Sequence, residues 1–102
     1  MNKRRILYVE DDETLAFLTA DNLEQYFEVV HCANGKAGFE LFCQEAFDLC
    51  VLDIMLPDMD GFEIATEIRK RNEEIPIILP KNKLSFFDLN IAGVSILYNE
   101  FK

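Results

Sequence analysis

Cysteine and histidine are scarce in this sequence. The three cysteines, Cys32, Cys43 and Cys50, are odd in number and widely spaced, and no Cys-x-x-Cys pair occurs. Neither a disulfide framework nor a zinc site is indicated, and a cytoplasmic location fits best. The one histidine, His31, excludes histidine-rich metal sites, because such ligands come in clusters. We expect His31 to be an ordinary packed or edge residue of a strand.

Basic residues and long apolar runs are also few. The 19 acidic residues against 10 basic ones give a formal net charge of -9, which repels nucleic acid phosphates and anionic lipid. The one basic cluster, residues 3–5, precedes an apolar run covering only residues 6–9, which is too short for a signal peptide or a membrane span. We therefore expect no direct nucleic acid binding and no membrane association.

Glycine occurs only 4 times, and its spacing forms neither a Gly-x-Gly-x-x-Gly motif nor a P-loop. The usual nucleotide-binding sites are therefore not indicated. Residues 58–61, with Glu67 further on, resemble part of a calcium loop. That motif fails because Leu56 would occupy the first ligand position and Pro57 intrudes.

The sequence does contain many apolar residues, and strand-like and helix-like patterns alternate along it. Half of the 102 residues are apolar and 9 are Phe, so one domain spanning residues 1–102 can bury a core without disulfides or a structural metal. Strand and helix patterns alternate, which predicts an α/β fold with a doubly wound parallel sheet. The predicted strands are residues 6–9, 28–33, 49–52, 75–79 and 94–98, and the predicted helices start at Glu13, cover 36–45 and 62–70, and open again at Ser85.

Helical periodicity also predicts which side chains face the core. In the second helix these are Ala37, Leu41 and Phe42. Phe17 falls on the polar side of the first helix, and the pattern does not explain it. The predicted buried side of that first helix consists of Leu15, Leu18, Thr19, Asn22, Leu23 and Tyr26.

Acidic side chains directly follow two of the predicted strands. Glu10, Asp11 and Asp12 come after the first strand, and Asp53 comes after the third. Ligands of doubly wound sheets lie beyond the carboxyl ends of the strands, so any arrangement that makes these two strands neighbours gathers the carboxylates. For Asp12 we prefer the plain alternative of a helix N-cap. For Glu10, Asp11 and Asp53 together we prefer a functional role.

Such a cluster favours a hard cation, because like charges within a few Å otherwise weaken the fold. Magnesium takes about six oxygen ligands and keeps several waters, so two or three carboxylates and a backbone carbonyl suffice. An ionised Asp53 could then attack phosphorus and form an aspartyl phosphate, with the metal stabilising the charge on the transferred group.

Two segments, residues 6–12 (ILYVEDD) and 51–62 (VLDIMLPDMDGF), closely resemble response regulator receiver domains. The resemblance implies the flavodoxin-like strand order 2-1-3-4-5. It also implies that Glu10 and Asp11 hold Mg²⁺, that Asp53 accepts the phosphoryl group, and that Met55 adds its backbone carbonyl to the metal shell. The donor would be a sensor histidine kinase, a phosphotransfer protein or a small phosphodonor. Such a domain is not an enzyme for other substrates, since it catalyses only its own phosphorylation and dephosphorylation.

The resemblance is close to about Leu79, and residues 80–102 are atypical. The family follows its fourth strand with Ser or Thr and a small residue, where this chain has Pro80, Lys81 and Asn82. The family's Lys-Pro pair is absent, and no room remains for a full last helix. We expect a truncated or divergent receiver that binds metal and accepts phosphate without the usual switch, and whose open sheet edge favours homodimers.

Two alternatives remain open. The loss of the switch positions favours a receiver-like interaction module that never transfers phosphate. A small metal-dependent phosphohydrolase acting through Asp53 is less favoured, because neither a second acid–base group nor a substrate pocket is evident.

Overall fold

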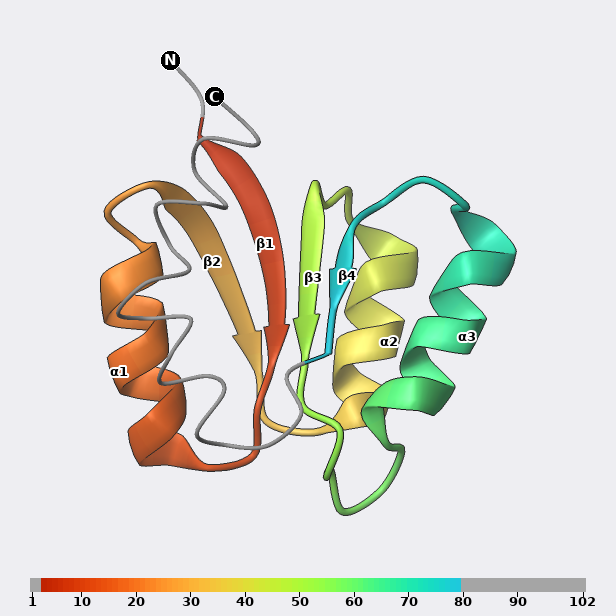
Figure 1. Ribbon diagram of the computed structural model, residues 1–102, viewed down its shortest axis with the longest axis horizontal. Coiled ribbons are helices and arrows are strands. Elements are labelled where there is room, and N and C mark those ends of the chain that lie inside the picture. Colours follow the sequence, from red (N-terminus) through yellow and green to blue (C-terminus); the bar gives the residue numbers. More distant parts are fainter. Residues whose placement is uncertain (1–2, 80–102) are drawn as a thin grey trace.

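Strands and helices alternate along residues 3–79, the part of the chain that the computed structural model describes (Figure 1). Acidic or amide side chains begin each helix: Asp12, Asn34 and Asp60 each accept a hydrogen bond from an amide in the first turn. These N-caps satisfy donors that have no partner within the helix. The described elements are β1 (Arg4–Val9), α1 (Glu13–Leu23), β2 (Phe27–Cys32), α2 (Gly35–Gln44), β3 (Leu49–Leu52), α3 (Gly61–Arg71) and β4 (Ile77–Ile78).

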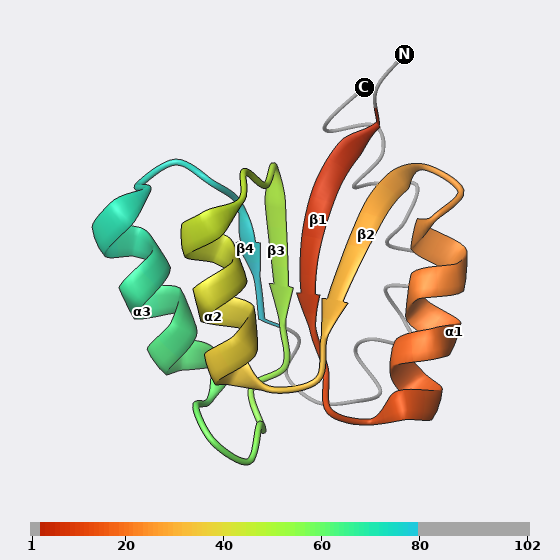
Figure 2. The ribbon, with the colours of Figure 1, turned by 180° about the vertical axis from the view of Figure 1, so that it is seen from behind.

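The strands form one parallel sheet in the order β2-β1-β3-β4. This order confirms the predicted doubly wound topology for these strands. Helix α1 covers one face of the sheet, while α2 and α3 cover the other (Figures 1 and 2). The predicted helix opening at Ser85 and the predicted fifth strand, residues 94–98, lie outside the described residues. Within residues 3–79, every helix is too short or too polar to cross a membrane.

Strand β1 is buried on both faces and divides the core into two parts. Ile6 and Tyr8 pack toward α1, whereas Leu7 and Val9 pack toward α2 and α3, and all four are fully buried. This explains why residues 6–9 of β1 form a continuous apolar run rather than an alternating one. Each such aliphatic side chain contributes about 1.5–3 kcal/mol through its burial.

The buried face of α1 differs from the predicted one. Leu15, Thr19 and Leu23 are buried as expected, but Ala16 is buried in place of Leu18, which is 41% exposed. The prediction for Leu18 is therefore wrong. The helix turns its small Ala16 toward the sheet, and this rotation moves Leu18 to the rim. Asn22, also predicted to be buried, is half-buried. Tyr26 lies after the end of the helix but packs against the same core. Phe17, which the pattern placed on the polar side, is 70% exposed.

The buried face of α2 was also predicted in part wrongly, because Ala37 is exposed. Gly35 and Gly38 are buried in its place, while Leu41 and Phe42 are half-buried against the core as predicted. A Cβ at Gly38 would lie 2.6 Å from Val9 Cγ2. The helix therefore approaches β1 through Gly38, a contact that an apolar periodicity count overlooks.

Strand β4 is shorter than the predicted range of residues 75–79. Pro76 lacks an N–H, so it can accept but not donate in the ladder. Its carbonyl does accept from the amide of Cys50 at 3.0 Å, and Ile75 beside it is buried. The apolar run therefore extends beyond the two residues that pair as a strand.

Candidate metal and phosphoryl site

The carboxyl ends of β1 and β3 lie side by side because these strands are neighbours, with Val9 opposite Leu52. The amide of Asp53 donates to the Val9 carbonyl at 3.0 Å, and the amide of Glu10 donates to the Cys32 carbonyl at 3.0 Å. These bonds continue the ladders one residue past the strands. Glu10 and Asp53 are thereby fixed at the same edge of the sheet.

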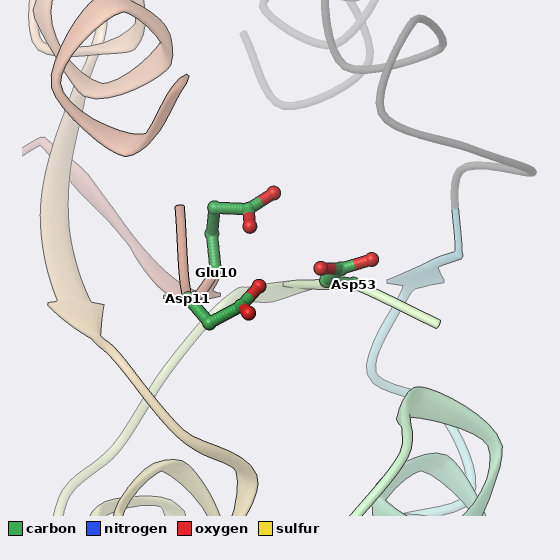
Figure 3. A group of neighbouring side chains, drawn as sticks. All are labelled: Glu10, Asp11 and Asp53. Carbon is green, nitrogen blue, oxygen red and sulfur yellow. The ribbon is translucent and has the colours of Figure 1, made fainter. Parts of the chain in front are cut away.

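Three of the predicted site residues, Glu10, Asp11 and Asp53, come together at this edge (Figure 3). Each offers a carboxylate oxygen, and these oxygens lie within 4.8 Å of one another. Glu10 is fully buried and Asp53 is 2% exposed, whereas Asp11 is exposed. The cluster is therefore held by buried side chains and opens to solvent on the Asp11 side.

Backbone amides and one ring hold Glu10 and Asp53 in place. Glu10 Oε2 accepts from the amide of Asp12 at 2.9 Å, and Asp53 Oδ1 accepts from the amide of Met55 at 3.0 Å. The carbonyl oxygen of Glu10 lies 2.8 Å from His31 Nε2, which must carry the hydrogen because a carbonyl only accepts. Fixed carboxylates suit ion binding, since little ordering is left to the binding step.

Two other residues near the cluster have different outcomes. Asp12 accepts from the amide of Leu15 at 2.9 Å and caps α1, as predicted. Met55 is 72% exposed and contacts Asp53 through its amide. The predicted metal contact of the Met55 carbonyl stays a prediction.

The donor set fits a hard divalent cation. All three side chains are carboxylates, and their mutual repulsion in a largely buried setting is relieved by a positive ion. Oxygen-only ligands and room for water on one side are what Mg²⁺ prefers. The residues present therefore match the predicted ion in chemical type and in spacing.

Sequence reasoning missed the contacts of His31 and Asp58. His31 stands opposite Tyr8 on β2, so only the register of the two strands brings its ring to Glu10. The sequence placed Asp58 in a failed calcium loop and in the receiver-like segment 51–62, but predicted no contact for it. In the structure its carboxylate binds the first amides of α2, at Gly35 and Lys36, both at 2.9 Å.

These hydrogen bonds make Asp58 a test of acid stability. The amide of Lys36 contributes most and that of Gly35 adds to it, and together they hold the pKa of Asp58 below its ordinary value of 3.8. A carboxyl whose pKa is lower in the folded state stabilises the fold above its unfolded pKa, and this stabilisation is lost as the pH falls through the folded pKa. We expect Asp58→Asn to lower the free energy of unfolding at neutral pH and to approach the wild type in acid.

Urea titrations of both proteins from pH 7 downward measure this difference. Because the side chain is exposed, we expect a modest change. A gap between wild type and Asp58→Asn that stays constant through acid pH would contradict the assignment.

Comparisons with known proteins agree with this fold. The model of the response regulator receiver domain matches residues 6–85. The transcriptional regulatory protein RprY of Bacteroides fragilis (strain YCH46) is 46% identical over 77 residues, covering 74% of this chain and 33% of RprY. The chain thus spans about a third of the length of that relative.

Solved structures give the same result. Response regulator protein TrrA of Thermotoga maritima, in complex with Mg(2+)-BeF, aligns with a TM-score of 0.71 and 36% identity over 74% of this chain and 67% of TrrA. A second structure holds TrrA in complex with the histidine kinase ThkA. It aligns with a TM-score of 0.69 and 36% identity over 74% of this chain and 66% of that chain.

Proposed function

This chain belongs to the response regulator receiver domain family, and from that membership we propose that it accepts a phosphoryl group on Asp53 from a sensor histidine kinase or a phosphotransfer protein. As a receiver domain of two-component systems it is a signalling module rather than a classical enzyme. The convergence of Glu10, Asp11 and Asp53 within 4.8 Å carries the proposal. The complexes of TrrA with Mg(2+)-BeF and with ThkA support it by analogy.

Glu10, Asp11 and Asp53 would hold Mg²⁺ together with the backbone carbonyl of Met55. The bound ion would neutralise negative charge on the transferred group. An Asp53 carboxylate oxygen attacks phosphorus, the bond from phosphorus to the donor nitrogen breaks, and the donor imidazole keeps the electron pair and takes up a proton. The amide of Met55 orients the Asp53 carboxylate through its bond to Oδ1.

Incubation with MgCl₂ and acetyl phosphate, followed by intact-mass measurement, tests the proposal. A persistent gain of one phosphoryl group supports the receiver function. Continuous release of phosphate without a labelled protein would point to the phosphohydrolase alternative. Absence of both would leave the interaction module, the alternative favoured by Pro80, Lys81 and Asn82 at the positions where the family has Ser or Thr and a small residue.

Magnesium should also stabilise the metal-binding fold against heat. A ligand at about 100 times its Kd adds about 2.7 kcal/mol to the free energy of unfolding, which corresponds to roughly 10–20 °C in melting temperature for a domain of this size. We expect MgCl₂ to raise the melting temperature of the wild type and EDTA to reverse the rise. Glu10→Gln, which removes one charge from the cluster, should lose most of this shift. Equal melting temperatures in MgCl₂ and EDTA would contradict the site.

A cytoplasmic location, the absence of nucleic acid and membrane binding, and homodimer formation stay predictions. Among the described strands, β4 lies at the edge of the sheet next to β3. Unpaired edges favour association with another strand. Sedimentation as a clean monomer at high concentration would speak against homodimers.

A further inference from the structure

The loop between β3 and α3, residues 53–60, is fastened to the beginning of α2. Asp58 Oδ1 accepts from the amide of Gly35 and Asp58 Oδ2 accepts from that of Lys36, each at 2.9 Å. These are the first two residues of α2, whose amides have no partner within the helix. Asn34, the N-cap, binds the next one, Ala37, at 2.8 Å. The first amides of α2 are thus satisfied partly by Asn34, directly before the helix, and partly by Asp58 of the loop.

A close backbone approach supports the same contact independently. A Cβ at Gly35 would lie 2.2 Å from the carbonyl oxygen of Met59 and 2.9 Å from Ile64 Cδ1. Main chain cannot yield as a flexible side chain does, so this position suits only glycine. The loop therefore packs on α2 directly, beside the hydrogen bonds of Asp58.

The loop has two attachments, one at its base and one in its middle. At the base the amide of Gly61 donates to the Ile54 carbonyl at 3.3 Å. In the middle of the loop Asp58 contacts α2, and Met55 lies between Ile54 and Asp58 in the sequence. In Figures 1 and 2 this loop lies next to the start of α2 at the end of the sheet. Fixing Asp58 therefore limits the positions open to Met55.

We propose that Asp58 is a positioning residue whose contact with α2 sets the main chain at Met55 for ion binding. The proposal rests on the proposed function, because Met55 matters only if its carbonyl joins the ion. Asp58 is not one of the three clustered carboxylates and would act through the loop. Loss of this contact should weaken Mg²⁺ binding even though every carboxylate of the cluster remains.

Calorimetric titration of the full chain with MgCl₂ tests this role. Supporting residues of metal sites typically change affinity by 10–100-fold, and we expect Asp58→Ala to raise the Mg²⁺ Kd by about tenfold. Asn34→Ala is the matched control, since it removes a cap from the same helix but leaves the loop contact. It should lower the melting temperature similarly and keep the Kd within about twofold. Asp58→Asn, which retains one acceptor oxygen, should recover part of the affinity.

Substitution of glycines in α2 tests the contact from the other side. Gly35→Ala forces a Cβ against the Met59 carbonyl, and we expect it to weaken Mg²⁺ binding with Asp58 intact. Gly38→Ala is its control, because its Cβ meets the Val9 side chain instead. Equal Kd values for Gly35→Ala and Gly38→Ala, or for Asp58→Ala and Asn34→Ala, would overturn the positioning role.

Amide hydrogen exchange separates this inference from the proposed function. Without Mg²⁺, Asp58→Ala should speed exchange at the Met55 amide by about tenfold, because the loop opens more often. Asn34→Ala should leave that rate near the wild-type value. If the wild type binds no Mg²⁺, the proposed function fails, whereas the role of Asp58 in holding the loop fails only if Met55 exchanges equally in all three proteins.

Discussion

Asp53→Asn will abolish labelling by acetyl phosphate in MgCl₂ while the protein stays folded. Asparagine has nearly the same shape, and its Oδ1 can still accept from the Met55 amide that now holds Asp53. The amide oxygen is a poor nucleophile, so labelling should fall by at least about 100-fold. Intact-mass measurement after a fixed incubation gives the labelled fraction.

The charge of the cluster also predicts the direction in which Asp53→Asn changes stability. Asp53 is 2% exposed and shares the cluster with Glu10 and Asp11, so removing its charge relieves repulsion when no cation is bound. We therefore expect the melting temperature of Asp53→Asn in EDTA to equal or exceed that of the wild type. Loss of labelling then cannot be attributed to unfolding.

Asp12→Asn is the matched control for this experiment. Asp12 lies next to Asp11 and caps α1, and asparagine caps helices about as well as aspartate. The variant removes one negative charge beside the cluster without removing a carboxylate from it, so labelling should stay within about twofold of wild type. Persistent labelling of Asp53→Asn, or equal loss in Asp12→Asn, would mean that Asp53 is not the phosphoacceptor.

The meeting of the carboxylates could be predicted because it depends on local signals and one topological rule. Glu10 and Asp53 each follow an apolar strand directly, and parallel strands end at the same edge of a sheet. Once β1 and β3 are neighbours, the register that pairs Val9 with Leu52 brings the two acids together. The position of each acid is local in the sequence, and only the strand order is needed in addition.

The contacts that hold the site and its loop in place could not be predicted in this way. Asp58 and the start of α2 are separated by more than 20 residues, and their contact follows from how α2 and α3 pack on the sheet. The bond from His31 to the Glu10 carbonyl needs the register of β1 and β2. The residue pattern of a single segment therefore predicts neither contact.

Helix faces were predicted only in part, since apolar periodicity gives a direction and packing decides the rotation. In α1 the small Ala16 faces the sheet and the larger Leu18 does not. In α2 Gly38 faces β1, Gly35 faces the loop at Met59, and Ala37 is exposed. Close approach favours small residues at the contact, which a count of hydrophobic residues treats as weak signals.

Two leucines of α1 allow the difference between the predicted and the observed buried face to be measured. Leu23 is fully buried and Leu18 is 41% exposed, although periodicity placed both on the buried face. We expect Leu23→Ala to lower the free energy of unfolding by about 2–5 kcal/mol, through lost burial and the cavity left behind. Leu18→Ala should cost less, about 1 kcal/mol, because Leu18 is already 41% exposed and therefore loses less burial than Leu23.

The comparison is sharp because the two variants make the same chemical change in the same helix. Leucine and alanine both favour helices, so intrinsic propensity contributes almost equally to the two values. A domain of this size has a total stability of about 5–15 kcal/mol, so Leu23→Ala should remove a large fraction of the free energy of unfolding. Urea unfolding at neutral pH measures both values, and equal losses would show that α1 sits in the rotation that periodicity alone favours.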